Sequence, residues 1–179
     1  MFFAASTNSL ILIFLVLNIF SFLAPELNIK SVKKANAQSF QPVEINLSMD
    51  EYEFRPESIR FKSGEEVILN VTNEGKEPHQ LAAGNFVKAG KSGFNQPLFK
   101  NIEVKRSVGS QQLKPLTPEE KQGNVIIELK PGQRGRLVFS IPFSKAGLWW
   151  IACFGRTESE TETHYQKGMK GVMLVEPQK

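Results

Sequence analysis

Residues 131–153 read PGQRGRLVFSIPFSKAGLWWIAC. After the Pro-Gly turn that opens this stretch, apolar side chains occupy every second position from Leu137 to Ile141, which is typical of a strand with one buried face. The apolar run from Leu148 to Cys153 predicts a second strand. These residues therefore favour a fold of short strands joined by turns.

Alternation along the second of these strands divides its side chains into two sets. Cys153, Ile151 and Trp149 share one face, and Ala152 and Trp150 share the other, because successive side chains of a strand point to opposite faces. We expect the first face to be the inner one. Cys153 then points inward from the end of a core strand.

The same pattern recurs on both sides of this stretch and predicts about eight short strands in all. The other six are expected at residues 43–49, 59–61, 67–71, 79–81, 125–129 and 171–175. Gly, Pro and Asn turns separate them, and there is no internal repeat. The sequence therefore predicts an all-β fold, a Greek-key β-sandwich of about eight strands.

Residues 84–124 differ from the rest, since they carry seven basic and three acidic residues and have little periodicity. We expect a long insertion within a single domain at 38–179. A short helix is predicted to start at Thr117-Pro118, with Thr as its cap and Pro in its first turn. Long loops of this kind are often functional or disordered. The insertion is either a basic flap for docking a partner or a solvated excursion without a role, and we favour the second interpretation.

The first 37 residues are typical of an export signal. An apolar run spans residues 10–23, and the small-x-small pattern Ala35-Asn36-Ala37 predicts cleavage before Gln38. No Lys or Arg precedes the apolar run, so an uncleaved membrane anchor is an open alternative. Both interpretations place the domain outside the cytoplasm, in a periplasm or a thylakoid lumen.

Length and charge set broad limits on function. The 179 residues are enough for one domain with its own core, and the net charge of +4 is mild. A DNA-binding protein is expected to concentrate its Lys and Arg on one helix or face. We therefore expect no nucleic-acid partner.

The chain has one cysteine and two histidines. A single Cys in an exported protein suggests an intermolecular bridge, a free thiol or a metal ligand, and taken alone it is more often a small buried hydrophobe. The order His79, Cys153, His164, Met169 favours a metal ligand instead. Imidazole and thiolate suit copper or zinc, and a weak axial thioether favours an electron-transfer copper site. We therefore predict one mononuclear copper site at these four residues.

At these motifs the sequence resembles the cupredoxins, in particular small plastocyanin-like bacterial domains. The resemblance covers roughly residues 43–83 and 125–176. It rests on the stretch quoted above, which leads to Cys153, and on two others. These are EYEFRPESIRFKSGEEVILNVTNEGKEPHQL at 51–81 and HYQKGMKGVMLVEP at 164–177.

The resemblance implies a type 1 (blue) copper site. His79, Cys153 and His164 match the family's ligands, and Met169 matches its axial ligand. The outer ring edge of His164 is the electron exit that the family leads us to expect. Apolar residues near the ligands in sequence are candidates for the rim of the site, namely Phe154, Leu81 and Tyr165.

The loop between Cys153 and His164 departs from the family pattern. Ten residues, FGRTESETET, intervene, whereas most small cupredoxins have only a few. Glu158, Glu160 and Glu162 alternate there with Ser and Thr. They could dock a basic partner or weakly bind a second ion, but we favour a solvated hairpin tip.

We expect a single-electron carrier between extracytoplasmic redox proteins, and not an enzyme. A binuclear centre needs a second Cys, catalytic coppers need further His residues, and a saturated site has no open position for a small-molecule substrate. We also expect a monomer. The alternatives are a copper-binding protein for delivery or storage and a metal-free interaction module.

Overall fold

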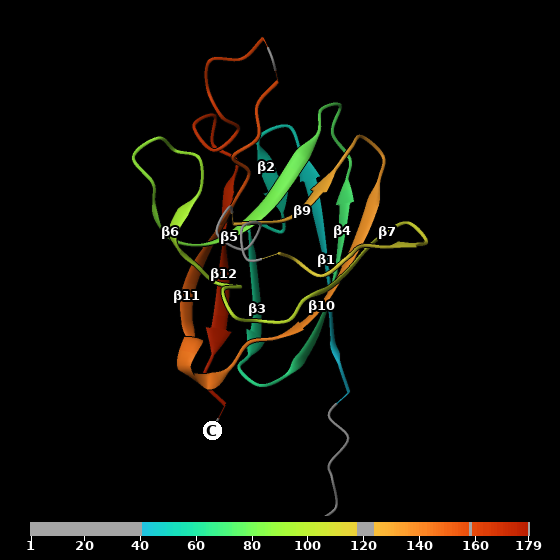
Figure 1. Cartoon of the computed structure of the whole chain (residues 1–179), viewed down its shortest axis with the longest axis vertical. Helices are drawn as coiled ribbons and strands as arrows, with labels where there is room; N and C mark the ends of the chain where they lie inside the picture. Colours follow the sequence, from blue (N-terminus) through green and yellow to red (C-terminus); the bar gives the residue numbers. More distant parts are fainter. Residues whose placement is uncertain (1–40, 118–123, 158, 179) are drawn as a thin grey trace, which may run out of the picture. The chain divides into compact units, whose positions relative to one another are not determined.

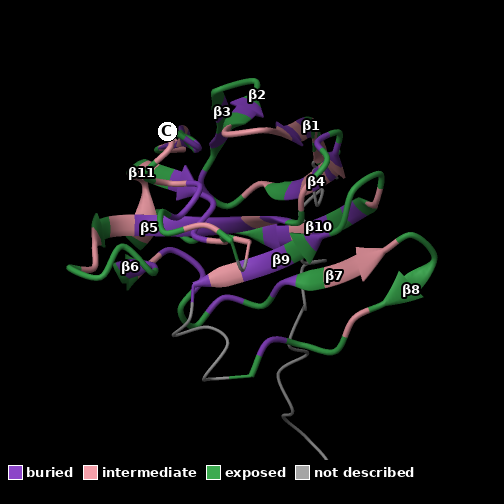
Figure 2. Ribbon diagram, turned by 90° about the horizontal axis from the view of Figure 1, so that it is seen from above, coloured by how far each residue is buried: buried purple, intermediate pink, exposed green. Residues whose placement is uncertain are grey.

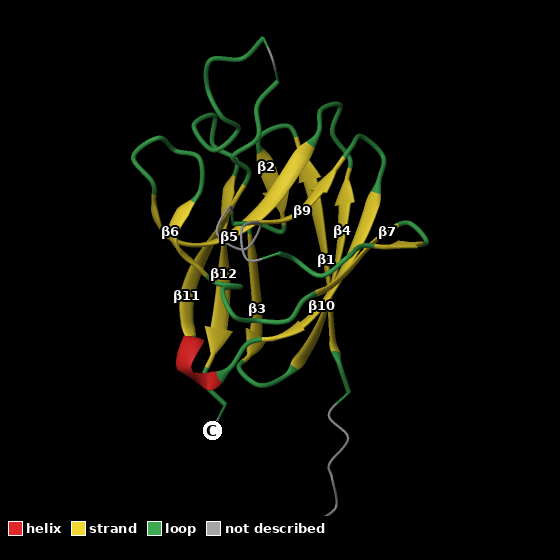
Figure 3. Cartoon of the chain, in the orientation of Figure 1, coloured by secondary structure: helices red, strands yellow, loops and turns green. Residues whose placement is uncertain are grey.

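Strands dominate the described residues of the computed structural model, which are 41–117, 124–157 and 159–178 (Figure 1, Figure 3). In chain order they are β1 (Val43–Asp50), β2 (Glu53–Arg55), β3 (Ser58–Lys62), β4 (Glu66–Asn73), β5 (His79–Val87), β6 (Phe94–Pro97), β7 (Lys105–Val108), β8 (Gln111–Gln112), β9 (Val125–Leu129), β10 (Arg134–Ser140), β11 (Gly147–Ala152) and β12 (Lys170–Glu176). A 3-10 turn, η1 (Phe143–Lys145), joins β10 to β11. All eight predicted strands are present. The additional strands β2, β6, β7 and β8 have two to four residues each, too few to produce a periodic pattern.

The strands form two mixed sheets with a shared apolar core. One sheet has the order β2-β1-β4-β10-β7-β8, and the other has the order β3-β12-β11-β5-β6, with β9 also paired to β5. The pairs β1–β4 and β12–β3 are parallel, and the remaining pairs are antiparallel. The predicted fold class, an all-β sandwich, is confirmed, although the described residues form twelve strands where about eight were predicted.

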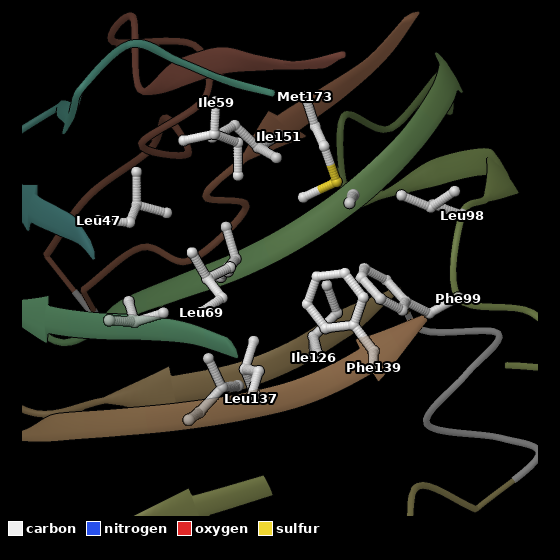
Figure 4. Packing of buried hydrophobic residues seen from close by; sticks show 14 of the residues in the cluster. Leu47, Ile59, Leu69, Leu98, Phe99, Ile126, Leu137, Phe139, Ile151 and Met173 are labelled. Carbon is white, nitrogen blue, oxygen red and sulfur yellow. The ribbon is translucent and has the colours of Figure 1, made fainter. Parts of the chain in front are cut away.

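The core lies between the inner faces of the two sheets, where the buried residues gather (Figure 2). In Figure 4, Leu69 and Leu137 come from one sheet, and Ile151 and Met173 come from the other. Each of these four side chains is fully buried. Burial of such a side chain contributes about 1.5–3 kcal/mol, so this layer fixes the register of both sheets.

The predicted two-sided character of β11 is confirmed. Ile151 and Cys153 belong to the main core, and Trp149 packs against it. Ala152 faces the other way, into a small second cluster, and Trp150 is 41% exposed. Cys153 follows the last residue of β11 directly, so it points inward from a strand end as expected.

The described part of residues 84–124 is not a solvated excursion, and that expectation is wrong. β5 continues to Val87, β6 pairs with β5, and β7 pairs with β10, so the segment extends both sheets. Its apolar side chains are buried at irregular intervals, so the periodicity of the sequence did not predict their burial. The buried ones are Phe94, Leu98, Phe99, Ile102, Val104 and Leu116.

Several predictions concern residues outside the described part of the chain. The export signal at 1–37, its cleavage and the anchor at 10–23 fall there, as do residues 118–123 of the helix expected from Thr117. Within the described residues, no helix has the length and apolar character needed to cross a membrane.

Candidate metal centre

Three neighbouring strands bring the predicted ligands to one end of the sandwich. His79 is the first residue of β5, Cys153 follows β11, and Met169 precedes β12. Because β11 pairs antiparallel with both β5 and β12, the end of β11 lies beside the starts of its two neighbours (Figure 1). The sheet itself therefore gathers residues that are up to ninety positions apart.

The two imidazoles and the thiol form a tight buried group. His79 Nδ1 lies 3.0 Å from His164 Nδ1, and Cys153 Sγ lies 4.0 Å from the first nitrogen and 3.4 Å from the second. All three side chains are fully buried. An ion held by three donors in a plane needs them about 3.5 Å apart, given metal–nitrogen and metal–sulfur distances of about 2.0 and 2.3 Å. The group therefore fits one metal ion.

Met169 is tied to two of these residues through the backbone. Its N–H donates to the His164 carbonyl at 2.9 Å, and its own carbonyl accepts the Cys153 N–H at 3.2 Å. The side chain is fully buried in the main core. Gly168, just before it, has a φ of 110°, a value that favours glycine and permits the turn into β12. The structure thus places the backbone of Met169 beside Cys153 and His164.

The Cys153 thiol stays protonated in this site unless a cation is present. Burial raises the pKa of the thiol to about 11, although the backbone N–H groups of Gln80 and Gly155 act in the opposite direction. The Gln80 N–H lies 3.2 Å from Sγ. Two such donors suit a thiolate, and a bound metal supplies the charge that deprotonates the thiol.

Burial holds the His79 ring neutral. Burial, and then the proximity of His164, lower its pKa to about 4, while Glu51 and Asp50 act in the opposite direction. Its Nε2 is buried without a hydrogen-bond partner among the described residues. A Cβ on Gly75 would lie 2.9 Å from this nitrogen, so the turn can pass the ring only because residue 75 is glycine.

The buried Asn73 side chain organises the turn that precedes His79. Its Nδ2 donates to the carbonyls of Glu77 at 2.8 Å and Leu129 at 2.9 Å, and its Oδ1 accepts the Gly75 N–H at 2.9 Å. These bonds tie the turn to β9, the strand that pairs with β5. Asn73 therefore sets where β5, and with it His79, begins.

His164 has a polar environment on its outer side. Its Nε2 lies 3.2 Å from Glu160 Oε2 and 3.2 Å from Glu77 Oε2, and the edge of the Tyr52 ring packs on it with centroids 5.3 Å apart. Burial lowers the pKa of His164, and Glu77 and Glu51 oppose that shift. The ring is fully buried, and Glu77, Glu160 and Tyr52 cover the outer edge that the family resemblance predicts to be the electron exit.

The loop carboxylates also differ from the solvated tip that was expected. The Glu160 side chain is only 11% exposed, because it folds back onto His164. Glu162 is exposed as expected, and Glu158 lies outside the described residues.

The three candidate rim residues separate into two places. Phe154 packs at 5.3 Å from the Tyr165 ring and at 5.1 Å from Phe94, on the outer side of β5 and β11. Leu81 lies in the main core instead.

Sequence reasoning missed the supporting roles of Asn73, Glu77 and Tyr52. Asn73 carried a usable signal, since Asn before Glu-Gly opens a turn whose side chain commonly bonds the backbone. Glu77 stands two residues before His79 and could have been examined for that reason. Tyr52 carried no signal, because only the tertiary fold brings it to His164.

No family model and no curated protein matches the chain. Solved structures do match. An auracyanin from Roseiflexus castenholzii has 19% identity and a TM-score of 0.48, over 75% of this chain and 98% of that one. Auracyanin B has 17% identity and a TM-score of 0.48, over 78% and 92%. A multicopper oxidase has 14% identity and a TM-score of 0.45, over 74% of this chain and 44% of that one. All three TM-scores lie below 0.5.

Proposed function

We propose that this chain is a type 1 copper protein that carries single electrons between redox proteins outside the cytoplasm. His79, Cys153 and His164 would hold the metal, with Met169 as the weak axial ligand. The observation that carries the proposal is the buried cluster of two Nδ1 atoms and one Sγ, 3.0–4.0 Å apart.

The donor set supports copper over other metals. A thiolate, two imidazoles and a thioether are the ligands of electron-transfer copper sites, whereas structural zinc sites use Cys and His without Met. Copper bound there would supply a one-electron couple between Cu(I) and Cu(II). The N–H of Gln80 on Cys153 Sγ would help to set its potential, since hydrogen bonds around this sulfur tune such sites.

The surroundings of the ligands support a carrier. His79 and Cys153 are fixed by paired strands, and a close-packed interior resists displacement of its side chains. Four ligands leave no open coordination position, and catalytic metal sites keep one. All four side chains are fully buried, which keeps solvent and small molecules from them. These features favour electron transfer at a closed site.

A visible spectrum of the full chain titrated with Cu(II), beside that of Cys153→Ser, tests the proposal. We expect an intense thiolate-to-copper band at one equivalent that a reductant bleaches and an oxidant restores. The variant should lack this band, because the serine hydroxyl is not a thiolate donor. A colourless protein that binds Cu(I) and releases it to a chelator within minutes would contradict electron transfer and favour copper delivery.

A further inference from the structure

Two carboxylates from distant parts of the chain converge on one nitrogen of a ligand. Glu77 lies in the turn before β5, and Glu160 lies in the loop between β11 and β12. Each places an Oε2 atom 3.2 Å from Nε2 of the buried His164 ring. The Glu160 oxygen has the alignment of a hydrogen bond with this nitrogen, whereas the Glu77 oxygen lies at the same distance with poorer alignment. Glu77 still acts on the ring, because its proximity raises the pKa of His164 against the effect of burial. Glu160 is therefore the primary partner of this nitrogen.

Glu160 is itself held in place on both of its oxygens. Its Oε2 accepts the Thr157 N–H at 2.7 Å, and its Oε1 forms an ion pair with Lys167 and accepts the Tyr52 hydroxyl at 3.4 Å. Lys167 also donates to the Tyr52 hydroxyl at 3.0 Å and lies 4.6 Å above the Tyr52 ring. A carboxylate fixed from three segments is already ordered, so little entropy is lost when it bonds His164.

We propose that Glu160 is a positioning residue for copper. It holds the Nε2–H of His164 so that Nδ1 faces His79 and Cys153, and its charge favours Cu(II) over Cu(I). This inference rests on the proposed function and assigns the long Cys153–His164 loop a role within it.

The chemistry follows from what each group can donate or accept. A neutral imidazole has one N–H and one lone pair, and an ionised carboxylate only accepts. A carboxylate on Nε2 therefore selects the tautomer that leaves the Nδ1 lone pair free for the metal. Such partners orient metal-binding histidines and raise their basicity, and losing one typically lowers metal affinity 10–100-fold. A more basic ligand and a nearby negative charge both favour the higher charge of Cu(II).

The same three residues could in principle share a second cation, because Glu77, Glu160 and His164 each offer one donor atom within 4.8 Å of the others. The contacts of Glu160 favour hydrogen bonding instead. Its Oε2 already accepts a backbone N–H, and Lys167 already supplies a positive charge. A second ion is therefore the competing outcome of the test.

The test uses the full chain with Glu160→Gln, and with Glu162→Gln as the matched control. Glu162 is in the same loop and exposed, so its variant makes the same charge change away from the ring. The first readout is ¹⁵N NMR of the histidine rings without metal, which reports the tautomer of His164. The second is the affinity for Cu(II) and, separately, for Cu(I).

We expect Glu160→Gln to reduce the Nε2–H tautomer of His164 and to weaken Cu(II) binding about 10–100-fold. Cu(I) binding should change less, so the reduction potential rises by about 59 mV for each tenfold selective loss. Glu162→Gln should match the wild type. Glu77→Gln, which leaves the loop contacts intact, should shift both readouts in the same direction by a smaller factor.

Three results would overturn the inference. The first is that Glu160→Gln and Glu162→Gln have the same His164 tautomer population and the same Cu(II) affinity. The second is a wild type that binds two equivalents of Cu(II) or Zn(II), with the second lost in Glu160→Gln, which would assign a shared ion site. The third is that Glu160→Gln loosens the loop while Glu77→Gln has the wild-type His164 tautomer and the wild-type Cu(II) affinity. A wild type without a blue band would instead refute the proposed function, and the metal-free tautomer would still report on Glu160.

Discussion

His79 and Cys153 are placed by paired strands, whereas His164 and Met169 are placed by a loop whose described residues form turns and no strand. The two histidine rings also have opposite surroundings. His79 Nε2 is buried without a hydrogen-bond partner among the described residues, while His164 Nε2 faces two carboxylates. The strand side of the site thus depends on packing and backbone bonds. The loop side depends on charged side chains.

This contrast indicates how a long loop can serve a rigid site. The ends of the loop are packed, since Phe154 and Tyr165 join the small second cluster and Met169 joins the main core. Hydrogen bonds and the ion pair of Glu160 with Lys167 restrain the part between them. Packing is insensitive to salt, whereas partly exposed charges are screened by it. The two sides should therefore respond differently to mutation, pH and substitution of the axial ligand.

The largest expected effect is on the strand side, at Asn73. Asn73→Ala removes three side-chain hydrogen bonds, two of which are buried. A buried group that loses its partner costs about 1–3 kcal/mol, so we expect a loss of about 2–6 kcal/mol in the free energy of unfolding. Urea denaturation of the metal-free full chain measures it.

Asn70→Ala is the matched control for that change. Asn70 is on the same strand, and its amide bonds Glu44 and Asn46 on the solvent side of the sheet. We expect a change of about 0.5 kcal/mol or less, because surface substitutions are rarely larger. Equal losses for the two variants would show that the turn before His79 has no special role.

The second effect is a pH dependence that also comes from the strand side. His79 has a pKa of about 4 in the folded protein against 6.5 normally, so below pH 6.5 the unfolded chain binds more protons. The stabilisation is complete above about pH 6.5 and is lost as pH falls toward 4. The loss from His79 is at most about 3 kcal/mol. Urea denaturation of metal-free protein at several pH values measures it.

His79→Gln provides the control for the pH prediction, because glutamine has no titrating ring. The variant should lose the part of the acid destabilisation that comes from His79 and keep the part that other groups contribute. If wild type and His79→Gln lost the same unfolding free energy between pH 6.5 and 4, the acid destabilisation would not come from His79.

Cys153→Ser should instead change how the free energy of unfolding falls at alkaline pH. The pKa of Cys153 is raised from 9.0 to about 11, so its stabilisation is present below pH 9 and is lost above it.

The same division explains what the sequence could predict. Alternation located the eight longer strands, and the scarcity of Cys and His singled out three candidate ligands, which the strands and the loop bring together. The contacts of Glu160 and Tyr52 were not accessible, because they join residues 108 positions apart through the tertiary fold. The buried residues of 94–116 were missed because they lie in very short strands and in loops, where buried side chains such as Phe94 and Leu98 recur at no regular spacing.

The smallest expected effect on stability compares Met169, just before β12, with Met173, within it. Met169 precedes the strand in the loop, and Met173 lies within it, and both are fully buried. Replacement of either by Leu nearly conserves volume, so each should cost less than about 1.5 kcal/mol of unfolding free energy. Stability alone should therefore not distinguish them.

The copper-loaded protein should distinguish them clearly. Met169→Leu removes the proposed thioether donor and should shift the reduction potential and the thiolate-to-copper band, because the axial ligand tunes both. Met173→Leu should leave both unchanged, since Met173 packs in the core between the sheets. Voltammetry and visible spectra of the two variants measure this difference. If both variants gave the wild-type potential, Met169 would be core filling, and the site would hold copper with the two histidines and the cysteine alone.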